Sequence, residues 1–403
     1  MSSRDLNNRT HEPMNRLIYI FTLVLFAAGC SAEEGWTPDP NEPRAFVTTL
    51  GADTTQVEVY TKTDSVIEGI YVSRIPSTYV IEYNARLDEG QNIVRLEAHR
   101  WTPETNPEGA SASRTVIEMA DGEAHIVREG GQNPGTSQVA ISGKPIPTLG
   151  FTAASAFIFE HVAEKLHGGT EQIVLLNSSG ADARANDARV VESDTVSMDY
   201  FGQRRKAWTD GMGQLLGISG AGTTNSSETR RVEPFLVGTH ANRWAGMDVV
   251  GTGLGVPSPG ATTQASVSGA DLEIRYSQPA KRGRDIWGGL VPEGSVWRTG
   301  ANAATHFSTS QELVFGEYTL EAGTYTLWSI YSDGMLQFIV NSQTNQWGTA
   351  HDPANDMFSI ASSKSDLEQS AERFSISIEE TDEGGQINLD WDMTRFSVSF
   401  TVN

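Results

Sequence analysis

The chain has 403 residues, a formal net charge of −22 and 38% hydrophobic residues. This length allows two or three domains, each large enough to bury a core of its own. The longest basic run is Arg204-Arg205-Lys206, and phosphate contacts need clustered positive charge, so we expect no binding to nucleic acid. The single cysteine excludes an internal disulfide framework and any metal site that needs several cysteines.

Residues 1–29 have the features of an export signal. Three arginines lie among the first sixteen residues, and an apolar run follows at residues 17–28. This run is too short to cross a bilayer, which takes about 20 residues. A basic flank, a short apolar core and small residues before a break are typical of a signal peptide that is removed from the mature protein.

The only cysteine, Cys30, follows Ala27-Ala28-Gly29 directly. This segment resembles the bacterial lipobox, with Ala27 in place of the usual Leu, and the resemblance implies that Cys30 is acylated and becomes the first mature residue. We therefore expect acyl chains on Cys30 to hold the protein in a membrane. The residue after the cysteine is Ser31 and not Asp. By the same resemblance, this implies the outer membrane of a Gram-negative bacterium. The alternative is an ordinary secretory signal with a chance cysteine.

Composition divides the remaining chain into two β-rich bodies. Residues 30–44 are polar and contain Pro, as a tether should, and residues 250–266 are rich in Gly, Pro, Ser and Thr without charge, which predicts a linker. The predicted organisation is a signal peptide at 1–29, a tether at 30–44, a first body at 45–249, a linker at 250–266 and a second body at 267–403.

The first body is predicted to be a curled antiparallel sheet with one helix. Period-two runs such as Gln56–Tyr60 and Ile67–Val72 alternate with short turns, which indicates meanders. Residues 152–166 lack Gly and Pro and carry apolar residues at helical spacing, so the helix is expected there. In architecture, residues 45–250 resemble the half barrels of periplasmic lipoprotein carriers, which implies an apolar groove for an acyl chain. The alternative is a closed core without a ligand.

The second body is predicted to be an antiparallel β-sandwich or jelly roll. Leu272, Ile274 and Tyr276 alternate with polar residues, and further strands of the same kind follow as far as Val402. Strands with one apolar face bury it when two sheets stack about 10 Å apart. The chain as a whole is therefore expected to be mostly β.

Several short motifs in the second body occur in a distinctive order. They are Tyr276–Pro279, Lys281–Gly283, Gly288–Pro292, Val296–Asn302, Ala322–Tyr325, Asn345–Thr349 and Trp391-Asp392. Together they resemble the family called domain of unknown function 2911, which occurs in secreted and lipid-anchored bacterial proteins. The resemblance implies a β-sandwich-like domain of the export compartment and no established reaction.

The candidate ligand-binding residues are Trp297, Arg298, Thr299, Asn302 and Trp347. A Trp face, an Arg fork and small polar groups on one loop are suited to gripping a sugar or a carboxylate. The alternative is structural: Trp297 plugs the end of the sandwich, Arg298 bonds loop carbonyls, and Gly300 permits a positive φ.

No complete catalytic constellation is recognisable in the sequence. Gly217–Ala221 departs from the nucleophile elbow at Ala221, and the eight histidines show no metal-binding spacing. We therefore expect no catalytic residues, no bound metal and no cofactor, although a convergence of His306, His351, Asp352 and Asp356 in space stays open.

The expected function is that of a lipid-anchored cell-envelope protein, in contact with the membrane through Cys30, that binds or scaffolds without turnover. The first alternative is a glycan-binding module centred on Trp297 and Arg298. The second is a hydrolase that uses carboxylates or a metal. A third is lipid handling by the first body. The residues do not settle whether catalysis occurs, but they favour a protein that is not an enzyme.

Overall fold

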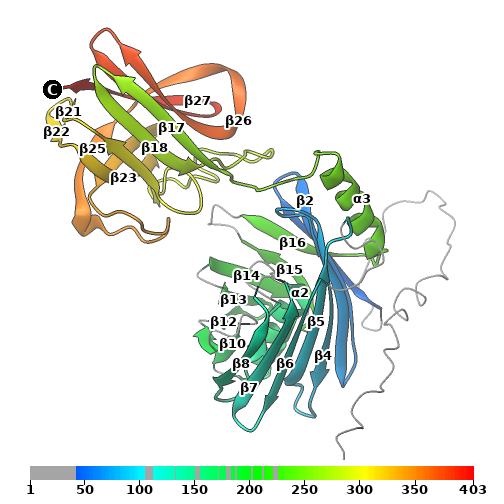
Figure 1. Ribbon diagram of the computed structural model, residues 1–403. Helices are drawn as coiled ribbons and strands as arrows, with labels where there is room; N and C mark the ends of the chain where they lie inside the picture. Colours follow the sequence, from blue (N-terminus) through cyan, green and yellow to red (C-terminus); the bar gives the residue numbers. More distant parts are fainter. Residues whose placement is uncertain are drawn as a thin grey trace, which may run out of the picture.

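The structure is a computed structural model that describes residues 42–104, 112–131, 133–149, 155–170, 172–177, 183–186, 188–200, 203–210, 213–220 and 226–403. The predicted signal peptide, Cys30, Ser31 and most of the tether lie outside the described residues. The described chain is mostly β, as predicted, and its strands form several antiparallel sheets without a closed barrel (Figure 1).

The first body is built on one sheet of 13 strands in the order β12-β13-β14-β15-β16-β1-β2-β3-β4-β5-β6-β7-β8, with every neighbouring pair antiparallel. Its strands are β1 (Arg44–Leu50), β2 (Asp53–Lys62), β3 (Val66–Ser73), β4 (Tyr79–Leu87), β5 (Ile93–Trp101), β6 (Ser113–Ala120), β7 (Glu123–Gly130), β8 (Gly135–Ala140), β12 (Ala188–Glu192), β13 (Thr195–Tyr200), β14 (Gln203–Thr209), β15 (Leu215–Ser219) and β16 (Ser227–Val232). The sheet curves around helix α2, and the meander expected from the alternation is confirmed (Figure 1).

Helix α2 (Ala156–His167) is the helix predicted at residues 152–166. Its N-cap is Ser155, and residues 151–154 are not described. Phe157, Ile158 and Phe159 are all buried, because the helix is covered on one side by the large sheet and packs with β10 in the same core. A three-stranded sheet of β9 (Ile146–Pro147), β10 (Ile173–Leu176) and β11 (Ala183–Asn186) completes this layer. Helix α2 thus occupies the sheet face where the half-barrel resemblance implied a groove.

The expectation of a single helix was incomplete, because α3 (Val237–Val249) is a second one. Its Val237, Ala241 and Trp244 pack on the opposite face of the large sheet, against Val57 and its neighbours. The segment contains Gly238 and Gly246, which disfavour a helix in isolation, so tertiary packing stabilises it. In the described part of the chain, neither helix is long and apolar enough to cross a membrane.

The second body is a sandwich of two sheets, as predicted (Figure 1). Its core contains Ile274 and Phe307 from one sheet and Phe374 and Leu389 from the other. The seven-stranded sheet contains β17 (Gly260–Val267), β18 (Ala270–Ser277), β19 (Val296–Trp297), β20 (Thr305–Thr309), β23 (Gly323–Ser332), β24 (Met335–Asn341) and β25 (Asp356–Ala361). The four-stranded sheet contains β21 (Leu313–Phe315), β22 (Tyr318–Leu320), β26 (Ser363–Thr381) and β27 (Gly384–Val402), and one 3-10 turn, η1, covers Pro353–Asn355.

Strand β17 corrects the predicted linker at residues 250–266, because Gly260–Val267 pairs with β18 along its whole length. The sequence resembles a linker because the half-buried positions Ala261, Thr263 and Ala265 carry small side chains. An edge strand with small inward residues gives little hydrophobic alternation. The connection between the two bodies is therefore residues 250–259, which lie between the end of α3 and the start of β17.

The two bodies also touch away from this connection. The carbonyl of Arg282 accepts a hydrogen bond from Ala52 N at 2.9 Å, and its guanidinium pairs with Asp53. Arg282 is buried and its backbone N donates to Glu372 at 2.8 Å. A turn of the second body therefore links the β1–β2 turn of the first body to strand β26.

Candidate functional site

Trp297 lies inside the sandwich and not on its surface. Its side chain is 3% exposed, its ring stacks on Trp391 with 5.9 Å between centroids, and its Nε1 donates to the carbonyl of Gly300 at 3.0 Å. Strand β19 pairs with β23 so that Trp297 faces Ser329. Of the two roles considered for Trp297, the structure places it in the packing role.

Thr299 is also sealed inside the second body. Its side chain is fully buried and shares a hydrogen bond of 2.9 Å with Ser329 Oγ, while its carbonyl accepts one of 2.8 Å from Thr305 Oγ1. Its φ of +51° and that of Gly300, +156°, bend the chain back toward the surface at Asn302. Thr299 therefore shapes the loop and does not face solvent.

Arg298, Asn302 and Trp347 come together at the surface, and we call these three residues the Trp347 surface. Arg298 Nη1 donates to the carbonyl of Asn302 at 3.0 Å, and the backbone N of Gly348 donates to the same carbonyl at 3.1 Å. A β-bridge joins Ala303 to Trp347. Trp347 is 58% exposed, the largest exposed aromatic side chain among the described residues.

Gly348 allows the two loops of the Trp347 surface to approach. A Cβ at this position would lie 2.3 Å from Arg298 Cδ and 2.4 Å from the Asn302 carbonyl oxygen. Asn302 is exposed, but its Nδ2 donates to the Ser258 carbonyl at 3.2 Å. Arg298 is half-buried, and burial lowers its pKa, which no carboxylate among the described residues raises again.

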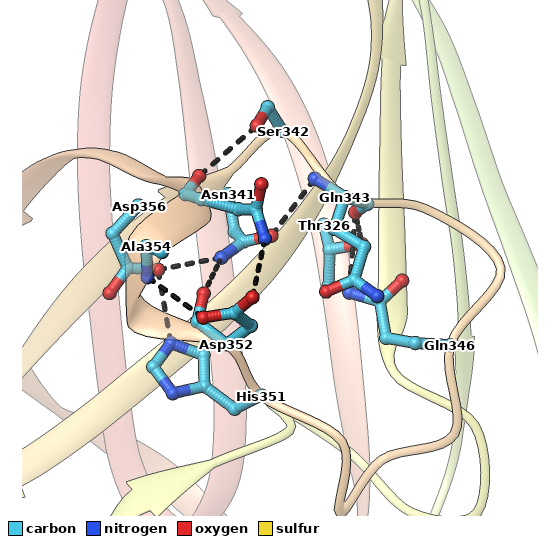
Figure 2. A network of polar contacts seen from close by, with 10 residues as sticks. Thr326, Asn341, Ser342, Gln343, Gln346, His351, Asp352, Ala354 and Asp356 are labelled. Carbon is cyan, nitrogen blue, oxygen red and sulfur yellow. Dashed lines mark hydrogen bonds and ion pairs between the residues drawn. The ribbon is translucent and has the colours of Figure 1, made fainter.

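Polar side chains from the end of β24 and from the segment that follows it form a cluster (Figure 2). His351 Nε2 and Asp356 Oδ1 are 3.0 Å apart, and buried Asn341 donates through Nδ2 to Asp356 Oδ1 at 2.7 Å and to the Asp352 carbonyl at 3.1 Å. Asp352 also caps η1 by accepting from Ala354 N at 3.0 Å. These bonds hold the segment from Asn341 to Asp356 onto the sheet.

Of the four residues whose convergence was left open, His306 does not join this cluster. Its Nε2 accepts a hydrogen bond of 2.8 Å from Asn345 N, and burial lowers its pKa. Among the residues that the structure describes, no group of three or more His, Cys, Asp or Glu is arranged to hold a metal ion. The cluster is a set of hydrogen bonds between loop and sheet.

The sequence reasoning missed Asn341 as a part of this region. Trp328 is 1% exposed and its ring meets His351 edge-on at 5.0 Å, while Gln346 Nε2 donates to Thr326 Oγ1 at 3.1 Å. A usable signal was present: Thr326 and Trp328 alternate with the inward Leu327. Such alternation marks a second sheet face that also needs a cover.

The comparisons with known proteins concern the second body. No curated protein matches the chain, and no solved structure matches it. The motifs that suggested the family resemblance lie on the sandwich and on the loops around the Trp347 surface. Residues 258–400 match the model of the family described as protein of unknown function (DUF2911), which confirms the predicted resemblance of the second body to this family.

Proposed function

We propose that the protein is a lipid-anchored cell-envelope protein of the outer membrane that binds a glycan at the Trp347 surface without turning it over. The observation that carries the binding part is the exposed indole of Trp347 beside the half-buried Arg298 and the exposed Asn302. The anchoring part is supported by the lipobox-like segment that ends at Cys30.

The chemistry of the Trp347 surface suits a sugar ring. An indole face offers a flat apolar platform for the C–H face of a pyranose, and an Arg fork offers N–H donors for ring substituents. The exposed face belongs to Trp347, since Trp297 is in the core. The original glycan hypothesis, centred on Trp297 and Arg298, is therefore moved to Trp347 and Arg298.

Binding without turnover is supported by what the neighbouring polar groups do. His351, Asp356 and Asn341 bond to one another, and Asp352 is used in capping η1. Groups that hold a loop in this way position the Trp347 surface, and stacking with hydrogen bonds is sufficient for recognition.

We expect Trp347→Ala to weaken glycan binding by about tenfold or more, because a Trp at the centre of a binding surface carries much of the energy. The measurement is isothermal titration of the full-length protein with maltotriose, trigalacturonate and a soluble peptidoglycan disaccharide. Met393, which is 44% exposed on the same body, provides the matched control Met393→Ala. A flat response of the unaltered protein to all three glycans would contradict the proposed binding.

We expect Cys30→Ala to move the protein from the membrane fraction to the soluble fraction, because several acyl chains, at about 0.8 kcal/mol per buried methylene, provide the anchor. Fractionation of cells followed by immunoblotting measures this. Ser31→Ala, which keeps the acylated thiol, is the control and should stay with membranes. Firm retention of Cys30→Ala in the membrane fraction would refute the anchoring.

A further inference from the structure

The guanidinium of Arg298 makes fewer hydrogen bonds than that of Arg284, another partly buried arginine of the second body. Arg284 donates from all three nitrogens, to the carbonyls of Lys281 and Ala280 and to Ser226 Oγ. Arg298, by contrast, makes one hydrogen bond in the described part of the chain, from Nη1 to the Asn302 carbonyl. None of its nitrogens is a buried atom without a partner, so the remaining N–H groups face solvent.

Among the described residues Arg298 also lacks an acidic partner, unlike three other cations of this body. Lys281 pairs with Asp392, Arg282 with Asp53 and Arg395 with Asp390. The chain carries 51 acidic residues against 29 basic ones, yet in the part of the chain that the structure describes no carboxylate offsets the desolvation of Arg298. A half-buried cation without a counter-charge is costly, and a bound anion would offset that cost.

We propose that the ligand of the Trp347 surface is an acidic sugar, whose carboxylate is bound by the free N–H groups of Arg298 while its ring stacks on Trp347. This inference rests on the proposed glycan binding and names the class of glycan. The planar fork of an arginine matches a carboxylate with two parallel hydrogen bonds. The β-bridge between Ala303 and Trp347 and the Arg298–Gly348 approach place the fork and the indole on adjoining loops.

Two kinds of acidic sugar share this chemistry: uronic acids, with the carboxylate on the ring, and muramic acid, with the carboxylate on a lactyl ether. The test is titration of the full-length protein with trigalacturonate, with the disaccharide of N-acetylglucosamine and N-acetylmuramic acid, and with neutral maltotriose. We expect at least one acidic ligand to bind about tenfold or more tightly than maltotriose, and the tighter of the two identifies the source. This preference should weaken as salt is added.

Arg298→Gln should weaken acidic-sugar binding by about 10- to 100-fold, since a charge-assisted bidentate pair is lost. Arg298→Lys, which keeps the charge but not the fork, should recover part of the affinity. Arg373→Gln is the matched control, because Arg373 is exposed on the same body and donates to one backbone carbonyl, that of Gln278. Near-ultraviolet circular dichroism of each variant separates a binding loss from a folding loss.

Equal binding of acidic and neutral sugars, unchanged in Arg298→Gln, would overturn this inference and leave the proposed glycan binding intact. Binding of acidic sugars that falls equally in Arg298→Gln and Arg373→Gln would also overturn it, because general charge attraction would then explain the preference. Failure of all three sugars to bind would overturn both the inference and the function on which it rests.

Discussion

Replacing Arg44 with methionine is expected to destabilise the first body by about 3–5 kcal/mol, because it leaves a buried carboxylate without its partner. Arg44 Nη1 lies 2.7 Å from Glu160 Oε1, and the two side chains are 10% and 2% exposed. Glu160 is on α2, and its Oε2 accepts from Leu215 N at 2.9 Å. The pair thus joins β1, α2 and β15 inside one core.

A double-mutant cycle, with stability measured by urea unfolding, tests the ion pair most directly. Glu160→Gln keeps an acceptor for Leu215 N but removes the charge, so Arg44→Met combined with Glu160→Gln should recover much of the stability that Arg44→Met loses. Equal losses in the single and double variants would show that the ion pair is not what Arg44 contributes. Arg95→Met is the control, since Arg95 pairs with Glu97 and Glu118 at a more exposed site and should cost about 1 kcal/mol or less.

The cycle also has an expected pH dependence. Burial raises the pKa of Glu160, and the Arg44 charge lowers it. Without Arg44 the pKa of Glu160 rises further, so the folded variant takes up a proton that the unfolded chain does not. A raised folded pKa of an acid means that stability falls as pH rises. The loss caused by Arg44→Met should therefore be larger at pH 8 than at pH 5.

The parts of the fold that could be predicted from the sequence are those with strong periodicity. The alternation of Leu272, Ile274 and Tyr276 required a second sheet to cover it, and the sandwich supplies it. Helix α3 and strand β17 were not predicted because their sequence signals are weak. Gly238 and Gly246 lower the helix propensity of α3, and the small inward side chains of β17 reduce its hydrophobic alternation. Helix α3 depends on packing partners that are distant along the chain, whereas β17 is held by its pairing with the next strand, β18.

The candidate site could be predicted as a set of residues but not as an arrangement. Trp297 and Arg298 are adjacent in the sequence, yet Trp297 is in the core and Arg298 reaches the surface. Which of two neighbours faces inward is set by the register of β19 on β23, and a one-residue shift would reverse it. Likewise, Trp347 lies near Arg298 because a β-bridge and backbone hydrogen bonds join two loops that are more than forty positions apart.

His161 should make the first body acid-sensitive. Its side chain is 2% exposed, and among the described residues neither ring nitrogen has a hydrogen-bond partner. Burial, together with the charges of Lys62 and Lys165, lowers its pKa from 6.5 to about 3. Glu164 is the one acid within ion-pairing distance among the described residues, with its Oε2 3.9 Å from Nδ1 of His161. Its charge would partly offset the free-energy cost of protonating the ring.

The direction of this pH dependence depends on whether the folded or the unfolded chain binds the proton. Between pH 6.5 and pH 3 the unfolded chain protonates His161 and the folded chain does not, so stability falls as pH falls. The loss from this group between pH 7 and pH 4 is about 3 kcal/mol. Glu58 and Glu160 act in the opposite direction, because burial raises the pKa of each, so the unaltered protein alone cannot isolate His161.

Comparison of His161→Leu with the unaltered protein at each pH cancels those carboxyl contributions. Urea unfolding gives the stability of the variant relative to the unaltered protein at each pH. We expect this relative stability to be about 3 kcal/mol greater at pH 4 than at pH 7. His167→Leu, at the exposed end of the same helix, should leave the difference between the two pH values near zero. A constant difference for His161→Leu across this range would mean that His161 is solvated or paired in the folded state, and that α2 is less deeply enclosed than its contacts indicate.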